Sequence, residues 1–119
     1  MKQFDFTPEA YARFAQKVYE IVATIPEGKV ATYGQIAAMA GEPDAAQEAG
    51  YAMSRVSPAQ NLPCHRVVNK AGTLSPEFAF GGQEKQRKLL EAEGITFTVK
   101  GRIDMSRHTW GEDEQLSLL

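Results

Sequence analysis

Residues 62–68 read Leu-Pro-Cys-His-Arg-Val-Val and hold the one cysteine of the sequence, Cys64, followed by His65 and Arg66. A cysteine becomes a strong nucleophile when its surroundings stabilise the thiolate, because an unperturbed thiol has a pKa of about 8.5. A histidine can take the thiol proton, directly or through water, and a carboxylate can orient that histidine. The segment is therefore a candidate nucleophile next to a candidate base.

Adjacency in the sequence does not bring the two side chains together. Neighbouring side chains in an extended segment point in opposite directions. Most lone cysteines are small buried hydrophobic residues, and a packed, hydrogen-bonded histidine is the corresponding alternative for His65. From these two residues alone, a purely structural role for Cys64 stays open.

The composition limits the kind of protein that carries this segment. The 119 residues fit one domain, residues 1–119, rather than two. Hydrophobic residues make up 43% and charged residues 24%, as in ordinary globular domains, which excludes a disordered chain or a coiled coil. A single cysteine excludes an internal disulfide and a multi-cysteine zinc site. His65 and His108 are too far apart in the sequence to suggest a metal-ligand cluster.

The charge and the absence of targeting patterns limit the cellular compartment and the kind of partner that we expect. The first residues lack the charged-then-apolar pattern of a signal peptide, and no apolar run approaches the roughly 20 residues of a membrane span. We therefore expect a reduced, cytoplasmic compartment and no membrane contact. The net charge of -2 removes the simplest argument for nucleic-acid binding, since a basic surface usually drives such binding through counterion release. DNA binding would have to rest on local geometry.

Helical periodicity and end signals predict the helices that position the segment. They are expected over residues 8–24, 33–40, 44–55 and 83–93. Thr32 with Gln35, and Asp44 with Gln47, have the spacing of capping boxes. The second and third helices, joined by a short turn that contains glycine, match a helix-turn-helix over about residues 32–56. A helical hairpin without a DNA role is the alternative.

Short β segments are expected in the second half of the chain. Residues 67–68 and 73–74 flank a turn and predict a hairpin, and residues 95–99 and 102–105 predict a wing. Residues 111–119 are acidic and are expected to form a flexible tail. The predicted fold class is α+β, a compact helical domain with a winged helix-turn-helix and small β-hairpins.

The longer context of Cys64 resembles the active-site half of the O6-alkylguanine-DNA alkyltransferase family. The motif Pro63-Cys64-His65-Arg66-Val67-Val68 is highly specific to that family. The downstream matches are Gly72, the Gly81-Gly82 pair, Lys85, Leu89-Leu90 and Glu93-Gly94. The upstream matches to its helix-turn-helix are Ile25-Pro26, Gly28, Val30, Thr32-Tyr33-Gly34, Ile36-Ala37 and residues 41–53. The resemblance covers nearly everything in residues 14–94 and implies an alkyltransferase C-terminal-domain-like fold.

The resemblance implies a DNA repair protein that flips O6-alkylguanine out of duplex DNA and transfers the alkyl group irreversibly to Cys64. Chemistry on a stacked base requires such extrusion. The implied activity is that of a single-turnover methylated-DNA–protein-cysteine methyltransferase, in which His65 would take the thiol proton through a water and Glu93 would orient His65. The active-site loop is then about residues 61–68. The implied partner is double-stranded DNA containing O6-alkylguanine, with no metal, no cofactor and a monomeric protein.

The resemblance also implies DNA contacts and a substrate pocket. The implied DNA-binding residues, on and around a recognition helix that enters the minor groove, are Tyr33, Ala46, Gln47, Gly50 and Arg55. The implied pocket residues are Tyr33, Met53, Val67, Ser75 and Phe80, with the main-chain carbonyls of Cys64 and Val67 reading the guanine edge. Simpler alternatives exist: Glu93 as a solvated carboxylate at a helix end, Tyr33 and Met53 as core residues. His108 has no matching motif and is expected at the surface.

Gln47 is a departure from the family pattern, because it occupies the position of an arginine that replaces the flipped base in the stack. Glutamine lacks the planar cation of arginine. The acids Asp44 and Glu48 give helix 44–55 a net charge of -1 with Arg55, which should weaken phosphate contact. Residues 75–80 are also expected to form a loop about two residues longer than the common version, with Phe78 or Phe80 where a pocket tyrosine is expected. Affinity for DNA and the range of alkyl groups therefore stay open.

The short architecture resembles the alkyltransferase-like proteins, which bind O6-alkylguanine without transferring the alkyl group and flag it for nucleotide excision repair. Residues 101–104 and Trp110 also resemble that subgroup, although its members usually carry tryptophan or alanine at the position of Cys64. Three hypotheses follow, in this order: a single-domain alkyltransferase, a lesion sensor with excision-repair partners, and a helix-turn-helix module without a repair function.

Overall fold

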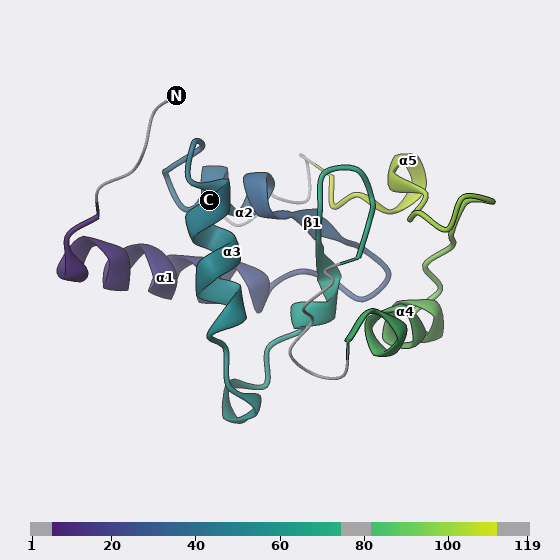
Figure 1. Ribbon diagram of the computed structural model, residues 1–119, viewed down its shortest axis with the longest axis horizontal. Helices are drawn as coiled ribbons and strands as arrows, with labels where there is room; N and C mark the ends of the chain where they lie inside the picture. Colours follow the sequence, from purple (N-terminus) through teal and green to yellow (C-terminus); the bar gives the residue numbers. More distant parts are fainter. Residues whose placement is uncertain (1–5, 75–81, 112–119) are drawn as a thin grey trace.

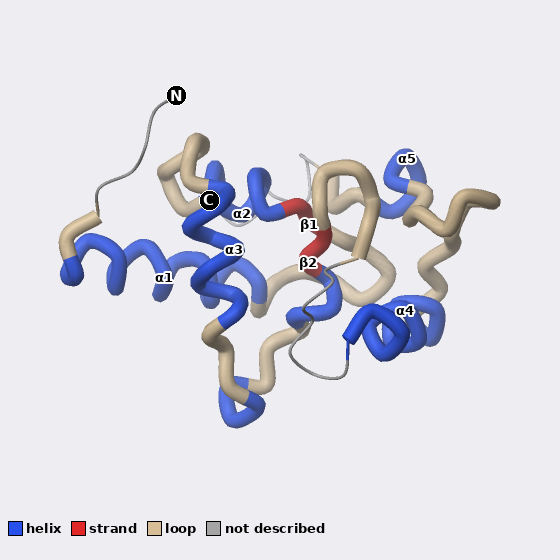
Figure 2. Tube along the Cα trace, in the orientation of Figure 1, coloured by secondary structure: helices blue, strands red, loops and turns tan. Residues whose placement is uncertain are grey.

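The computed structural model describes residues 6–74 and 82–111, and it is mostly helical (Figures 1 and 2). The helices are α1 (Pro8–Val22), α2 (Tyr33–Met39), α3 (Ala46–Ser54), α4 (Gly82–Ala92) and the short α5 (Met105–His108), with single 3-10 turns η1 (Pro58–Gln60) and η2 (Cys64–Arg66) and strands β1 (Ala31–Thr32) and β2 (Val67–Val68). Along the long axis, α1 and α3 lie at one end and α4 and α5 at the other, with the strands between them (Figure 2). The predicted α+β class is confirmed. In the described part, no helix has both the length and the apolar character that a membrane span needs.

Helix α1 forms because a cap and an apolar stripe act together. The Thr7 hydroxyl accepts a hydrogen bond from the Ala10 amide at 3.1 Å, and Pro8 occupies the first position of the helix. Phe14, Val18 and Val22 recur at helical spacing and are buried. The helix ends two residues before the predicted boundary.

The two predicted capping boxes have different outcomes. At α2, the Thr32 hydroxyl accepts from the Gln35 amide at 3.1 Å and the Gln35 side chain accepts from the Thr32 amide at 2.9 Å, so this box is confirmed. The box of Asp44 and Gln47 is wrong. Helix α3 begins only at Ala46, without a side-chain cap, because a turn closed by the Ala45 amide and the Glu42 carbonyl precedes it.

The strands pair differently from the prediction. Residues 67–68 do not form a hairpin with residues 73–74; β2 runs parallel to β1, with Ala31 opposite Val67 and Thr32 opposite Val68. Residues 69–73 form a turn, closed by the Asn69 amide and the Thr73 carbonyl at 3.2 Å. The predicted wing is reduced to one antiparallel bridge between Phe97 and Ile103.

Two buried clusters form the core. The larger lies among α1, α2 and α3 and includes Met53, Cys64 and Val67. The smaller joins β2 to α4 and the wing, and its members are Val30, Val68, Leu90, Ile95 and Ile103. Consecutive residues Val67 and Val68 therefore belong to different clusters, since the side chains of a strand alternate in direction. The turn that carries Cys64 lies directly before this junction.

The expectation that His108 lies at the surface is wrong. Its exposed fraction is 8%, and its Nε2 accepts a hydrogen bond from the Thr96 amide at 3.0 Å. An Nε2 that accepts from a main-chain N–H carries no proton, so the ring holds its proton on Nδ1. His108 therefore joins α5 to the wing as a structural residue.

Candidate functional site

A single 3-10 turn presents Cys64. Pro63 precedes the turn, the Cys64 amide donates to the Leu62 carbonyl at 2.8 Å, and the Arg66 amide donates to the Pro63 carbonyl at 3.0 Å. The Val67 amide closes the turn on the Cys64 carbonyl, and β2 begins there. Isolated 3-10 turns are weak, so side chains from other elements must hold this one.

Glu93 provides much of that support from the residue after the end of α4. Its Oε2 lies 2.7 Å from Nε2 of His65. Arg66 donates from Nε to Oε1 at 2.9 Å and from Nη2 to Oε2 at 2.8 Å, which is the paired geometry that guanidinium and carboxylate favour. Arg66 also donates from Nη1 to the Ile25 carbonyl at 2.8 Å. The solvated alternative for Glu93 is excluded, because its side chain is 11% exposed.

The surroundings of Glu93 keep it ionised. Burial alone raises the pKa of its carboxyl, but hydrogen bonds from Arg66 and His65 and their positive charge lower it overall, from 4.5 to about 2. An ionised carboxylate accepts hydrogen bonds only, so His65 donates from Nε2. In the neutral ring, Nδ1 is then the acceptor. His65 thus has the tautomer that a general base needs.

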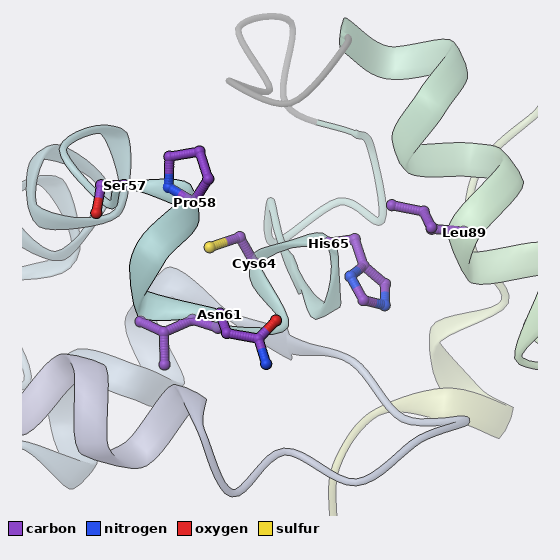
Figure 3. A pocket seen from close by; sticks show the side chains of 7 residues that line it. Ser57, Pro58, Asn61, Cys64, His65 and Leu89 are labelled. Atoms are coloured by element: carbon purple, nitrogen blue, oxygen red, sulfur yellow. The ribbon is translucent and has the colours of Figure 1, made fainter.

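Cys64 is not an activated thiol in this arrangement. Its exposed fraction is 8%, and burial raises the pKa of the thiol from 9.0 to about 11, although a backbone hydrogen bond lowers it. Figure 3 shows the sulfur directed toward Ser57 and Pro58, with the His65 ring on the other side of the turn. Within residues 6–74 and 82–111, no hydrogen bond joins the sulfur to His65. The thiol is therefore protonated at neutral pH.

A cavity of about 300 Å³ lies beside the cysteine (Figure 3). It is lined by Ser57, Pro58, Asn61, Leu62, Cys64, His65 and Leu89. Asn61, at its rim, has a φ of 51°, in the left-handed region that residues other than glycine seldom adopt. Such strain often accompanies functional loops. The cavity brings the thiol and the imidazole to one space although they do not touch.

A second cavity, of about 630 Å³, lies on the helix-turn-helix face. It is lined by Thr32, Tyr33, Gly34, Gln35, Ala46, Gln47, Gly50, Asn69 and Lys70. It therefore brings together four of the five predicted DNA-binding residues. A Cβ at Gly50 would lie 3.8 Å from the Tyr33 ring, in ordinary van der Waals contact, so α3 packs beside the aromatic side chain at this point.

The other predicted site residues lie elsewhere. Arg55 follows the last residue of α3 and lies over the exposed Tyr51 ring, 5.7 Å from its centroid. Met53 and Val67 are 8% and 1% exposed in the core and are not among the residues that line the two cavities. Ser75 and Phe80 lie outside the described residues, as does the predicted loop 75–80.

Sequence reasoning missed two supports of the turn, the Arg66 clamp on Glu93 and the buried amide of Gln86. Arg66 is inside the motif, and its positive charge could have been paired with Glu93. Gln86 lies four residues before Leu90, on the face that a helical projection buries. As for metals, the described residues contain no group of three or more side chains suited to hold an ion.

Comparison with known proteins decides the family. The family model of the 6-O-methylguanine DNA methyltransferase, DNA binding domain, matches residues 13–95. This chain belongs to that family. The resemblance inferred from Cys64 and its neighbours is confirmed.

Three relatives from this family are similar to the chain. A DNA base-flipping protein of Escherichia coli strain K12 is 44% identical over 100 residues, which cover 82% of this chain and 74% of the relative. A methylated-DNA–protein-cysteine methyltransferase of Mycobacterium leprae is 41% identical over 80 residues, covering 67% of this chain and 47% of the relative. The crystal structure of S. pombe Atl1 in complex with damaged DNA containing O6-carboxymethylguanine superimposes with a TM-score of 0.73 at 38% identity, covering 84% of this chain and 96% of that one.

Proposed function

We propose that this protein binds O6-alkylguanine in duplex DNA with the base turned out of the helix, and that it holds the lesion reversibly without taking the alkyl group. Membership of the DNA-binding-domain family supports the DNA part of the proposal. Similarity to a DNA base-flipping protein, and to a relative whose crystal structure contains O6-carboxymethylguanine DNA, supports the flipped lesion. Alkyl transfer to Cys64, which the family resemblance implies, is the second candidate.

The main support for the proposal is that the Cys64 thiol is protonated and directed away from His65 (Figure 3). Alkyl transfer needs a thiolate aimed at the alkyl carbon. Here burial raises the pKa of the thiol to about 11, the sulfur faces Pro58, and Glu93 holds the His65 ring on the other side of the turn. In the described residues the sulfur therefore has no hydrogen bond to the candidate base.

The helix-turn-helix face supports DNA contact. Tyr33 and the small residues Ala46 and Gly50 line one cavity with Gln47 and Lys70, so a backbone can approach closely there. Gln47 and Lys70 are exposed and able to reach a duplex. Because α3 is poor in basic residues, we expect modest affinity for undamaged DNA and a preference that arises from the flipped base.

Alkyl transfer to Cys64 is the second candidate, favoured by the His65–Glu93 pair next to a cysteine in one cavity. In that reaction Sγ attacks the alkyl carbon, the bond between that carbon and O6 breaks, and the thiol proton leaves through His65. It requires a water that connects the sulfur to Nδ1 of His65, as the family resemblance implies.

A reversible complex does not repair the lesion by itself, so other proteins must remove it. We propose proteins of nucleotide excision repair as partners, and a cytoplasmic location for the complex. The protein is expected to act as a monomer, because one cavity serves one base.

Fluorescence anisotropy tests the proposal with a duplex that carries one O6-methylguanine and a matched duplex that carries guanine. We expect tighter binding to the damaged duplex, and the same preference in Cys64→Ser, because reversible binding needs no nucleophile. Equal affinity for both duplexes would contradict the proposal and leave a helix-turn-helix module without a lesion preference.

A further inference from the structure

Gln86 is a buried polar side chain in a helix whose other polar residues reach solvent. It is 0% exposed, as is Leu90 one turn later on the same face of α4. Burying an amide is costly unless it is hydrogen-bonded. A glutamine in this position therefore has to find partners in the core.

The partners of Gln86 are two main-chain carbonyls of the cysteine turn. Its Nε2 donates to the His65 carbonyl at 3.1 Å and to the Val67 carbonyl at 3.3 Å. An amide nitrogen carries two hydrogens, so both bonds can form at the same time. The two carbonyls flank Arg66, and one side chain thereby connects the middle of η2 to the start of β2.

Helix α4 reaches the same turn a second time through Glu93. Gln86 and Glu93 are seven residues apart, which is about two helical turns and places them on one side of the helix axis. Glu93 holds the side chains of His65 and Arg66, whereas Gln86 holds main-chain atoms. The ring and the carbonyl of His65 are thus both fixed from one helix.

We infer that Gln86 is a positioning residue for lesion binding: it orients the carbonyls of the turn, and thereby the direction of Cys64 and of the surface offered to the flipped base. This inference rests on the proposed function, because it assigns the cavity beside Cys64 to the lesion. Gln86 acts through the turn and contacts no DNA. Nothing in the family motif around Cys64 identifies it.

Gln86→Met tests the inference, because methionine keeps the length of the side chain and removes both donated hydrogens. Gln83→Met is the matched control on the same helix, since Gln83 is exposed and its Nε2 donates to the Leu74 carbonyl at 3.1 Å. We expect Gln86→Met to lower the ratio of damaged to undamaged affinity by about fivefold or more, as the loss of two hydrogen bonds implies. Affinity for the undamaged duplex should stay within about twofold.

Reaction with iodoacetamide gives a readout that needs no DNA. The Sγ–C bond forms, iodide leaves, and the thiol proton is lost to solvent. Because Cys64 is 8% exposed, a loosened turn should speed its modification about fivefold or more in Gln86→Met, but not in Gln83→Met. Ile103→Ala, at the wing, provides a variant of lowered stability whose substitution lies in the smaller core cluster, which does not contain Cys64. An equal rate increase at equal loss of stability in Ile103→Ala would overturn the inference and make Gln86 a packing residue.

The wild-type side chain can be tested without substitution, which keeps the inference testable if Gln86→Met does not fold. Both Gln86 side-chain amide protons should exchange with solvent more slowly than those of Gln83, and their NMR signals should shift when damaged duplex is added but not when undamaged duplex is added. Fast exchange, or equal shifts with both duplexes, would overturn the inference. If wild-type protein showed no lesion preference, the proposed function would fail, while the iodoacetamide and exchange measurements would still decide whether Gln86 holds the turn.

Discussion

Oε2 of Glu93 lies 2.7 Å from Nε2 of His65, and the same carboxylate receives two hydrogen bonds from Arg66. The pair is a candidate orienter and base, but the base does not contact the cysteine beside it in the sequence. Glu93 therefore stabilises the turn through His65 and Arg66, whether or not Cys64 reacts.

Glu93→Gln should destabilise the protein by about 3 kcal/mol at pH 7, because it leaves Arg66 without its buried anion. The pKa of Glu93 is lowered from 4.5 to about 2, a difference worth roughly 3 kcal/mol. A lowered pKa in the folded state gives a stabilisation that is complete above about pH 4.5 and is lost as the pH falls toward 2. Urea unfolding at pH 7 and at pH 3 measures both effects.

Glu91→Gln is the control for that experiment, since Glu91 is an exposed acid on the same helix, paired with Arg87 at 3.3 Å. It should change the free energy of unfolding by less than about 0.5 kcal/mol. If Glu93→Gln kept the full acid sensitivity of the wild type, the Glu93 interactions would not be the cause.

The Cys64 thiol should react slowly at neutral pH and faster as the pH rises. Burial raises the pKa of the thiol from 9.0 to about 11, so the thiolate fraction grows about tenfold per pH unit up to that value. The rate of iodoacetamide modification, followed by intact mass, should keep rising between pH 9 and 11. The protein unfolded in urea should instead approach its plateau near pH 9. A plateau near pH 7 in the folded protein would show an activated thiol and contradict this description of Cys64.

Gln47→Arg should strengthen DNA binding. Gln47 is exposed on α3 and lines the cavity of Tyr33. One added phosphate contact should steepen the dependence of log affinity on log salt by about 0.9 for both damaged and undamaged duplexes. Gln16→Arg adds the same charge on the exposed side of α1 and should leave the slope unchanged. Equal slopes in the two variants would mean that α3 does not face the DNA backbone.

Thr32→Ala should cost about 1 kcal/mol, because it removes the cap at the start of α2. Asp44→Ala should cost less than about 0.5 kcal/mol, since α3 has no side-chain cap. Thermal or urea unfolding of the two variants compares them directly. A larger loss in Asp44→Ala would restore the capping box that the structure lacks.

Local signals in the sequence predicted the parts of the fold that local physics determines. The Thr32–Gln35 box involves residues three apart, and its two hydrogen bonds form as expected. The Asp44–Gln47 pair has the same spacing, but the turn ending at Ala45 moves the helix start beyond Asp44. A capping motif therefore predicts a helix start only when the preceding turn lets its first residue be the cap.

The long-range contacts could not be predicted from patterns. The pairing of Ala31–Thr32 with Val67–Val68 joins two-residue strands that are far apart in the chain, and such short parallel strands carry no periodic signal. His108 was expected at the surface because no family motif includes it, yet its ring is buried and accepts a hydrogen bond from the Thr96 amide. The contact of His65 with Glu93 was implied by the family resemblance. No motif in the sequence predicted the hydrogen bonds from Gln86 of α4 to the carbonyls of the cysteine turn.

Intact mass after incubation with duplex DNA containing O6-methylguanine tests the central claim most directly. The proposal predicts no change in mass in a sample that binds the damaged duplex in preference to the undamaged one. A gain of one methylene, about 14 mass units, that is absent in Cys64→Ser would show covalent transfer to the cysteine and contradict the proposal.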